Sequence, residues 1–156
     1  MERRDLNLKN LDEVLVEIHR LSDGGYDKLG QWDLAQVCHH CASPIEQTID
    51  GYTFRVPLPI RLIIIVTGAK RKFFRRRDIK PGLSAPATTL PPEGLETAEQ
   101  IKRYEAAVKR LKTHTGDFHA HPFFGTMTPD AWEQFHTIHT MHHLRFLRPH
   151  DPGAGG

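Results

Sequence analysis

The sequence is poor in the features that mark several large classes of protein. Only two of its 156 residues are cysteines, which excludes a fold held together by several disulfides. The longest aliphatic run, Leu62 to Val66, has five residues, far below the roughly 18 that indicate a membrane-spanning helix. Neither charge sign dominates, because the chain has 21 Lys and Arg residues and 19 Asp and Glu residues. This near-balance argues against a protein whose whole surface binds nucleic acid.

The remaining composition predicts one folded domain. Hydrophobic residues make up 38% of the chain and charged residues 26%, values typical of a globular protein. We expect a single domain over residues 1–148 and a disordered tail over residues 149–156, where Pro and Gly predominate. No apolar signal region follows Met1 to Asp5, so we expect a cytoplasmic protein with no membrane span.

Apolar residues at helical spacing predict two helices in the first third of the chain. The first covers residues 11–21, with Asn10 as N-cap and Glu13 as its capping-box partner. The second runs from about residue 31 to about residue 48. Pro44 lies inside the second helix, where it predicts a kink or an early stop.

Two further helices are expected in the second half. One runs from about Thr97 to about Thr113, with Thr97 and Gln100 as a capping box. The other starts behind Thr128 as N-cap and continues to about Leu147. Four helices predict an all-α protein, a four-helix bundle.

The connection between the second and third helices is expected to be long and irregular. Prolines interrupt residues 52–96, and the segment 60–66 fits a short helix or a strand equally well. Residues 70–77 carry six basic side chains around Phe73 and Phe74. Such a run is usually a solvated face, but it also fits contact with nucleic acid, a membrane surface or an anionic substrate.

Histidine is the residue that stands out. The chain has eleven, eight of them from His114 onward. Advancing 100° per residue along the fourth helix predicts that four histidines share the side of Trp132 and Phe135. These are His136, His139, His142 and His143. Polar residues, Thr137 and Thr140 among them, are expected mostly to face away.

Clustered imidazoles on an apolar face favour a metal site. Several neighbouring histidines cannot all be protonated in an apolar cluster, whereas a metal ion binds neutral imidazole. His139 and His143 are four residues apart, so both can bind one ion from the same helix face. The alternative is a metal-free bundle with a histidine-rich core.

A third ligand is expected from another part of the chain. The candidates are His39 and His40 on the second helix, and His119 and His121 in the loop of residues 116–125 between the third and fourth helices. Helical phase does not decide between His39 and His40, because they flank the apolar stripe on opposite sides.

Cys38 and Cys41 offer a rival interpretation. Cys-x-x-Cys near histidine can hold zinc, but a closed zinc site usually needs a second pair, and the chain has no other cysteine. A redox pair would follow a strand at a helix start, whereas this one lies in mid-helix. We favour packing in the core for both cysteines.

Two segments resemble the motifs of the DinB-like metal-binding bundles. Residues 32–40, Trp-Asp-Leu-Ala-Gln-Val-Cys-His-His, are similar to the first motif, in which a Trp precedes a ligand His by eight residues. Residues 139–143, His-Thr-Met-His-His, are similar to the last-helix motif, whose first and fifth positions are ligands. The chain resembles most closely an uncharacterised subgroup, through residues 36–38, 121–125, Trp132 and 142–144. The resemblance covers roughly residues 10–148.

The resemblance implies His40, His139 and His143 as metal ligands, and so selects His40 over His39. It also implies an up-down-down-up four-helix bundle that is often dimeric. Characterised relatives in the superfamily include transferases and isomerases that use low-molecular-weight thiols.

Two functional hypotheses follow. The first is a metal-dependent enzyme, a transferase or hydrolase, that acts on a small molecule with zinc, nickel or iron and a low-molecular-weight thiol. His136 and His142 would then orient the ligands or relay protons. The alternative is a non-catalytic metal-binding bundle that engages an anionic partner through residues 70–77.

Overall fold

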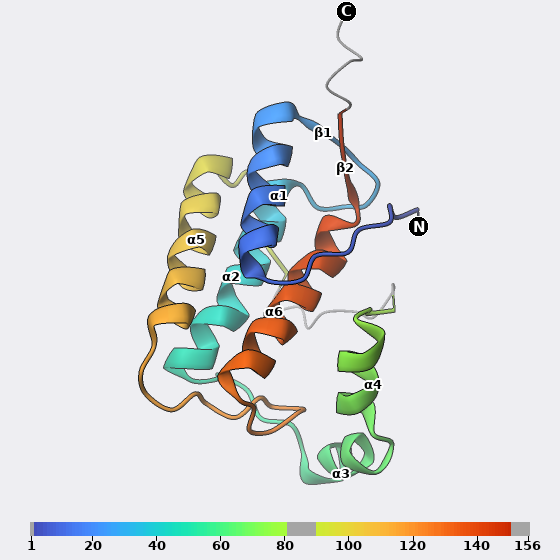
Figure 1. The fold of residues 1–156 in the computed structure, drawn as a ribbon, viewed down its shortest axis with the longest axis vertical. Coiled ribbons are helices and arrows are strands. Elements are labelled where there is room, and N and C mark those ends of the chain that lie inside the picture. Colours follow the sequence, from blue (N-terminus) through green and yellow to red (C-terminus); the bar gives the residue numbers. More distant parts are fainter. Residues whose placement is uncertain (1, 81–89, 151–156) are drawn as a thin grey trace, which may run out of the picture.

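The computed structural model describes residues 2–80 and 90–150, which are mostly helical (Figure 1). The described helices are α1 (Leu11–Gly24), α2 (Leu34–Asp50), α3 (Leu58–Val66), α4 (Ala69–Arg76), α5 (Thr97–Thr113) and α6 (Pro129–Leu144). Two short strands, β1 (Tyr26–Lys28) and β2 (Leu147–Pro149), pair antiparallel. The expected all-α class is correct in outline, because this sheet is a minor addition.

The core lies where α1, α2, α5 and α6 pack on one another. Helix α2 contacts both α5 and α6, and α1 contacts all three of the others. The largest fully buried apolar side chains come from each of these helices: Leu11, Ile18 and Leu21; Leu34 and Ile45; Tyr104; and Trp132, Ile138, Met141 and Leu144. Burial of this core positions α2 and α6 side by side.

Helix starts follow the local sequence, with some corrections. The Asn10 side chain accepts a hydrogen bond from the Glu13 backbone at 2.9 Å, as expected of an N-cap. The predicted capping box does not close, because the Glu13 carboxylate accepts from the backbone N–H of Lys9 at 2.7 Å instead of from that of Asn10. Helix α2 begins behind Asp33, which forms a reciprocal capping box with Gln36. The predicted box between Thr97 and Gln100 is wrong, because Glu96 is the N-cap of α5 and makes no side-chain cap.

Pro44 does not stop α2, which continues to Asp50. The carbonyl of Pro44 accepts a hydrogen bond from the Thr48 hydroxyl at 2.9 Å. The tertiary contacts of α2 with α5 and α6 extend along the helix and outweigh the one backbone donor that proline lacks.

The sequence predicted an irregular connection between α2 and α5, but the structure contains two helices there. It contains α3, which settles the choice between helix and strand at residues 60–66, and α4, which carries the basic run. Pro57 and Pro59 lie at the start of α3, where a missing backbone N–H costs little. The prolines at 81 and 86 fall outside the described residues.

Helix α6 is buried on more sides than expected. Thr137 and Thr140 are fully buried, contrary to the prediction that they face away, because α6 contacts both α1 and α2. The Thr140 hydroxyl lies 2.9 Å from that of Tyr104 on α5. The helix ends at Leu144, and Leu147 begins β2. Pro149 pairs with Tyr26 in that sheet, and residues 151–156 of the predicted tail fall outside the described residues. Within the described ranges, no helix has the length and apolar character needed to cross a bilayer.

Candidate metal centre

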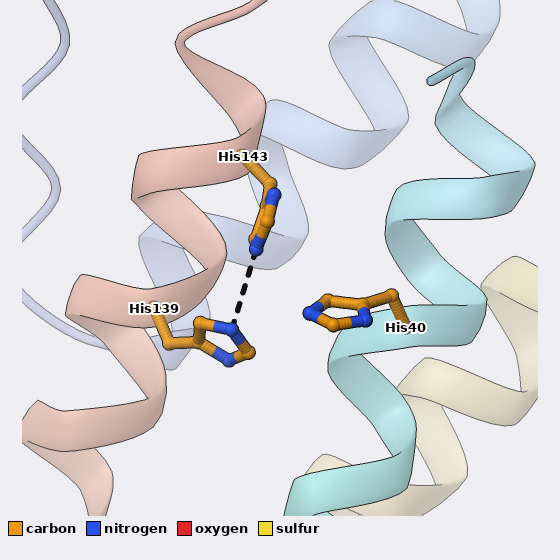
Figure 2. A group of neighbouring side chains, drawn as sticks. All are labelled: His40, His139 and His143. Carbon is orange, nitrogen blue, oxygen red and sulfur yellow. Dashed lines mark hydrogen bonds between the residues drawn. The ribbon is translucent and has the colours of Figure 1, made fainter. Parts of the chain in front are cut away.

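Three histidine rings converge between α2 and α6 (Figure 2). His40 comes from α2, and His139 and His143 come from successive turns of α6. The Nε2 atoms of His139 and His143 lie 3.3 Å apart. One nitrogen from each of the three rings lies within 4.8 Å of the other two. The arrangement therefore directs three imidazole nitrogens at one small volume.

Aromatic side chains border this cluster, in which His40 is buried and His139 and His143 are half-buried. The Trp32 ring stacks on His143 with centroids 5.0 Å apart, and its centroid lies 4.7 Å from that of His40. On the other side, the Phe135 ring stacks on His139 at 6.2 Å. These rings limit hydration of the imidazoles, and so disfavour their charged forms.

Burial keeps the cluster neutral. It lowers the pKa of His139 and of His143 well below the usual value, and the neighbouring imidazoles lower both further. Neutral imidazole is the form that binds a metal ion. The buried Nδ1 atom of His139 has no hydrogen-bond partner among the described residues. The rings are therefore neutral, and each can donate a nitrogen lone pair to a metal ion.

The spacing of the nitrogens fits a divalent ion. Zinc–imidazole bonds of about 2.0–2.1 Å in a tetrahedral site separate two ligand nitrogens by roughly 3.3 Å. The His139–His143 pair has this separation, and one nitrogen of His40 lies within 4.8 Å of both. Three neutral nitrogens suit zinc, nickel, iron or copper.

The other third-ligand candidates point elsewhere. The Nδ1 atom of His39 lies 3.0 Å from Gln100 Oε1 and 3.0 Å from Arg103 Nη1, both on α5. The Nδ1 atom of His121 accepts hydrogen bonds from the backbone nitrogens of residues 123 and 124. The ring of His119 lies against Gly51, beyond the end of α2. The structure thus groups His40, and none of these three, with the α6 pair.

His136 and His142 border the cluster without bonding to its rings. His136 Nε2 lies 3.0 Å from the Thr48 hydroxyl, and its ring stacks on Trp132. His142 packs edge-on against His143, with ring centroids 4.9 Å apart. Burial lowers the pKa of His136 to about 3 and that of His142 to about 4, so both rings are neutral near pH 7.

The two cysteines belong to the core. Both are buried and unbridged, in agreement with the packing interpretation. Burial raises the pKa of the Cys38 thiol to about 12 and raises that of Cys41 as well. Thiols held in this protonated form are poor nucleophiles and poor metal ligands.

The position of Phe135 beside the histidines was predicted from helical phase. Phe135 precedes His139 by four residues, so the two share one face of α6, and the structure stacks their rings. The enclosing role of Trp32 carries no local signal, because Trp32 lies outside α2 and reaches His143 only through the tertiary fold.

Comparison with known proteins identifies one family. The sequence model of the family described as "Protein of unknown function (DUF1569)" matches residues 1–150. No curated protein and no solved structure matches the chain.

Proposed function

The chain belongs to this family of proteins of unknown function (DUF1569), and from its geometry we propose that His40, His139 and His143 bind one divalent metal ion. The convergence of three neutral imidazole nitrogens, two of them 3.3 Å apart, carries the proposal. A metal ion would stabilise this arrangement, because three apposed imidazoles can share few hydrogen bonds and are costly to protonate in a partly buried site.

We further propose that the site is catalytic rather than structural. Structural zinc sites usually have four protein ligands, whereas this cluster supplies three among the described residues. An ion held by three nitrogens keeps a coordination position for a small molecule and lowers the pKa of a water or thiol that binds there. Trp32 and Phe135 would exclude bulk water from that position.

The reaction class rests on the resemblance to the DinB-like bundles. It favours a transferase or hydrolase that acts on a small molecule, with a low-molecular-weight thiol as co-substrate. The same resemblance predicts that α1, α2, α5 and α6 form an up-down-down-up four-helix bundle, and that the chain is a homodimer. A cytoplasmic location remains a prediction from the sequence.

Titration of the metal-stripped chain with zinc, nickel, cobalt and iron tests the metal site. We expect saturation at about one ion per chain for at least one of these metals, with a rise in melting temperature. The His139→Ala and His143→Ala variants should lose this saturation. If both variants bind as the parent does, the ion is elsewhere and the proposal fails.

The thiol proposal has its own test. Cobalt bound to the parent chain should gain near-ultraviolet absorption when a low-molecular-weight thiol is added, because a thiolate ligand introduces sulfur-to-cobalt charge transfer. An unchanged spectrum at saturating thiol would contradict the thiol preference, while leaving the metal site itself standing.

A further inference from the structure

Helix α3 exposes an apolar surface that no other part of the described residues 2–80 and 90–150 covers. None of its nine residues is buried, and Ile63, Ile65 and Val66 retain 62%, 68% and 84% of their accessible surface. Leu58, Ile60 and Leu62 are exposed as well. Figure 1 shows α3 at the lower edge of the molecule, away from α1 and α5. Aliphatic side chains grouped in this way are typical of a binding surface.

The charge of the chain is concentrated around the same helix. Residues 51–77 contain eight of its 21 basic residues and none of its 19 acidic ones. Four basic side chains of α4 are exposed and make no ion pair within the described residues: Arg71, Lys72, Arg75 and Arg76. Elsewhere most arginines pair with a carboxylate, as Arg4 does with Glu17 and Arg103 with Glu46. Although the net charge of the chain is near neutral, residues 51–77 form a strongly cationic segment.

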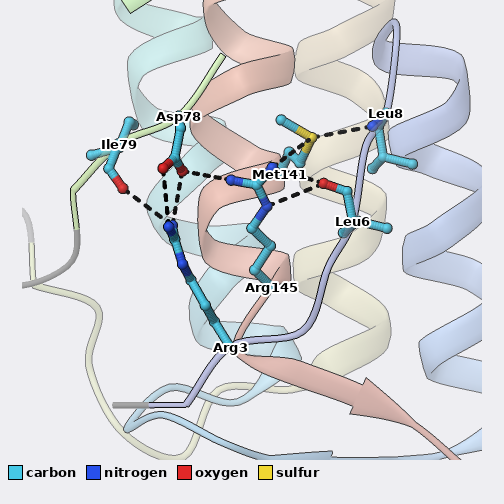
Figure 3. Close-up of polar contacts among 7 residues, drawn as sticks. All are labelled: Arg3, Leu6, Leu8, Asp78, Ile79, Met141 and Arg145. Carbon is cyan, nitrogen blue, oxygen red and sulfur yellow. Dashed lines mark hydrogen bonds and ion pairs between the residues drawn. The ribbon is translucent and has the colours of Figure 1, made fainter. Parts of the chain in front are cut away.

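Helix α4 is held firmly against the body of the protein. Phe73 packs on Phe135 of α6, with ring centroids 5.3 Å apart. Lys70 Nζ donates to the carbonyls of residues 124 and 126. Beyond the helix, Asp78 accepts hydrogen bonds from Arg3 and from Arg145 of the α6 C-terminus (Figure 3). The exposed basic face of α4 is thus presented in a fixed position.

The apolar and cationic surfaces meet in one cleft. A cavity of about 460 Å³ lies between α3, α4 and the Phe123–Phe124 pair. Ile64 and Ile65 contribute to its apolar lining, and Lys70 and Arg71 lie beside them. A ligand surface that fits here must offer hydrocarbon and negative charge together.

We propose that α3 and α4 attach the protein to the surface of an anionic lipid bilayer. The aliphatic side chains of α3 would enter the boundary between headgroups and acyl chains, and the exposed Lys and Arg residues of α4 would contact anionic headgroups. At about 1.5 Å per residue, nine helical residues extend roughly 13 Å, too short to cross the hydrocarbon core. Helix α3 therefore lies in the plane of the interface.

Other partners use only half of this surface. A nucleic acid would neutralise the basic side chains of α4, but it would leave the exposed aliphatic side chains of α3 in water. A second copy of the chain could cover α3, but two-fold symmetry would bring the two cationic segments together, and their repulsion would oppose the contact. Of these three partners, the anionic bilayer is the one that satisfies both features.

Vesicle flotation with the full chain tests the proposal. We expect the protein to float with vesicles of equal parts phosphatidylserine and phosphatidylcholine, and not with phosphatidylcholine alone. The Lys72→Ala/Arg75→Ala variant should bind roughly 25-fold more weakly, from about fivefold for each charge near the surface. The Lys102→Ala/Lys109→Ala variant is the matched control, because it removes two exposed lysines of α5.

A second pair of variants separates lipid from other polyanions. Ile63→Ser/Val66→Ser should weaken vesicle binding by at least about tenfold, because each side chain leaves the apolar boundary. Val16→Ser, at an exposed residue of α1, should have no effect. Inorganic phosphate and duplex DNA serve as competitors, and neither should displace the parent chain from vesicles at equal phosphate concentration.

Three outcomes would overturn the proposal. The first is the absence of flotation with the anionic vesicles. The second is flotation that the Ile63→Ser/Val66→Ser variant retains in full and that DNA abolishes, which would indicate a general polyanion surface. The third is a dimer in solution that this variant dissociates and that does not float, which would identify a second copy of the chain as the partner.

Discussion

His39 and His40 are neighbours in the chain, yet their rings face different helices. His39 lies against Gln100 and Arg103 of α5, whereas the His40 ring centroid lies 4.8 Å from that of His143 on α6. Successive residues of a helix point about 100° apart, and α2 contacts both α5 and α6. His39→Ala and His40→Ala are therefore a matched pair of variants. Each removes one imidazole ring, and the two rings differ in the helix that they face.

Trp32 should report metal binding directly. Its ring lies within 5.0 Å of the rings of both His40 and His143, measured between centroids. Nickel, cobalt or copper at the cluster should therefore quench tryptophan fluorescence. We expect Trp32→Phe to remove most of the quenching and Trp132→Phe to preserve it. Quenching that survives Trp32→Phe would place the ion away from this cluster.

The Thr48 hydroxyl should stabilise the fold through His136. The hydroxyl donates to the carbonyl of Pro44, so it accepts from the Nε2–H of His136 at 3.0 Å. Thr48→Val leaves that buried donor unpaired and should lower the free energy of unfolding by about 1–3 kcal/mol. Urea denaturation of the metal-free chain measures the loss.

Thr48→Ser is the control for this hydrogen bond. It keeps the hydroxyl and should cost only about 1 kcal/mol for the missing methyl group. Metal affinity should be unchanged in both variants, because His136 makes no bond to the cluster rings. A loss in Thr48→Ser as large as that in Thr48→Val would contradict the role given to the hydroxyl.

Asp78 should fix the end of α4 on the body of the protein. Its hydrogen bond to Arg3, strengthened by the charges of Arg3 and Arg145, lowers the pKa of the carboxyl. A third of the Asp78 side chain is exposed, so we expect Asp78→Ala to cost only about 1–2 kcal/mol. Amide exchange in α4 should accelerate in this variant.

The pair between Asp50 and Arg110 provides the comparison. It is more exposed and lies far from α4 in the chain, so Asp50→Ala should leave amide exchange in α4 unchanged. Equal exchange rates for α4 in Asp78→Ala and the parent would show that other contacts hold the helix in place.

The stability of the fold should depend on the neutral form of His121. Burial, together with the charge of Lys70, lowers its pKa to about 4. The unfolded chain takes up this proton near pH 6.5, so the contribution is complete above that pH and is lost as the pH falls toward about 4. Between about pH 6.5 and pH 5.5 the loss from this group is roughly 1 kcal/mol.

A glutamine at this position removes the titration but keeps an acceptor for the backbone. The chelator-treated His121→Gln variant should therefore lose about 1 kcal/mol less than the parent over the same pH interval, measured by urea denaturation. Identical losses in the two chains would mean that His121 does not remain neutral in the folded protein.

Helices with one apolar stripe and one polar face could be predicted closely from the sequence. Helix α5 spans Thr97–Thr113, the range expected from its stripe, and α6 begins behind Thr128 as expected. Helix α3 could not be assigned, because a run of consecutive aliphatic residues carries no periodicity that separates helix from strand. The burial of Thr140 was missed because α6 has neighbours on more than one side.

Part of the candidate site could likewise be predicted from the sequence, and part could not. The pairing of His139 with His143 follows from their spacing on one helix and needs no tertiary information. The choice between His39 and His40 depends on which side of α2 faces α6, and the residues of α2 alone do not contain that information. The resemblance to a known family supplied it, and the structure groups the same three histidines.

Elemental analysis of the purified protein tests the central claim most directly. The chain is expressed without a polyhistidine tag as the parent, as His40→Ala and as His39→Ala. We predict about one divalent ion per chain in the parent and in His39→Ala, and a loss of that ion in His40→Ala. Equal metal content in the parent and His40→Ala, or a parent that neither contains nor takes up zinc, nickel or iron, would contradict the three-histidine site.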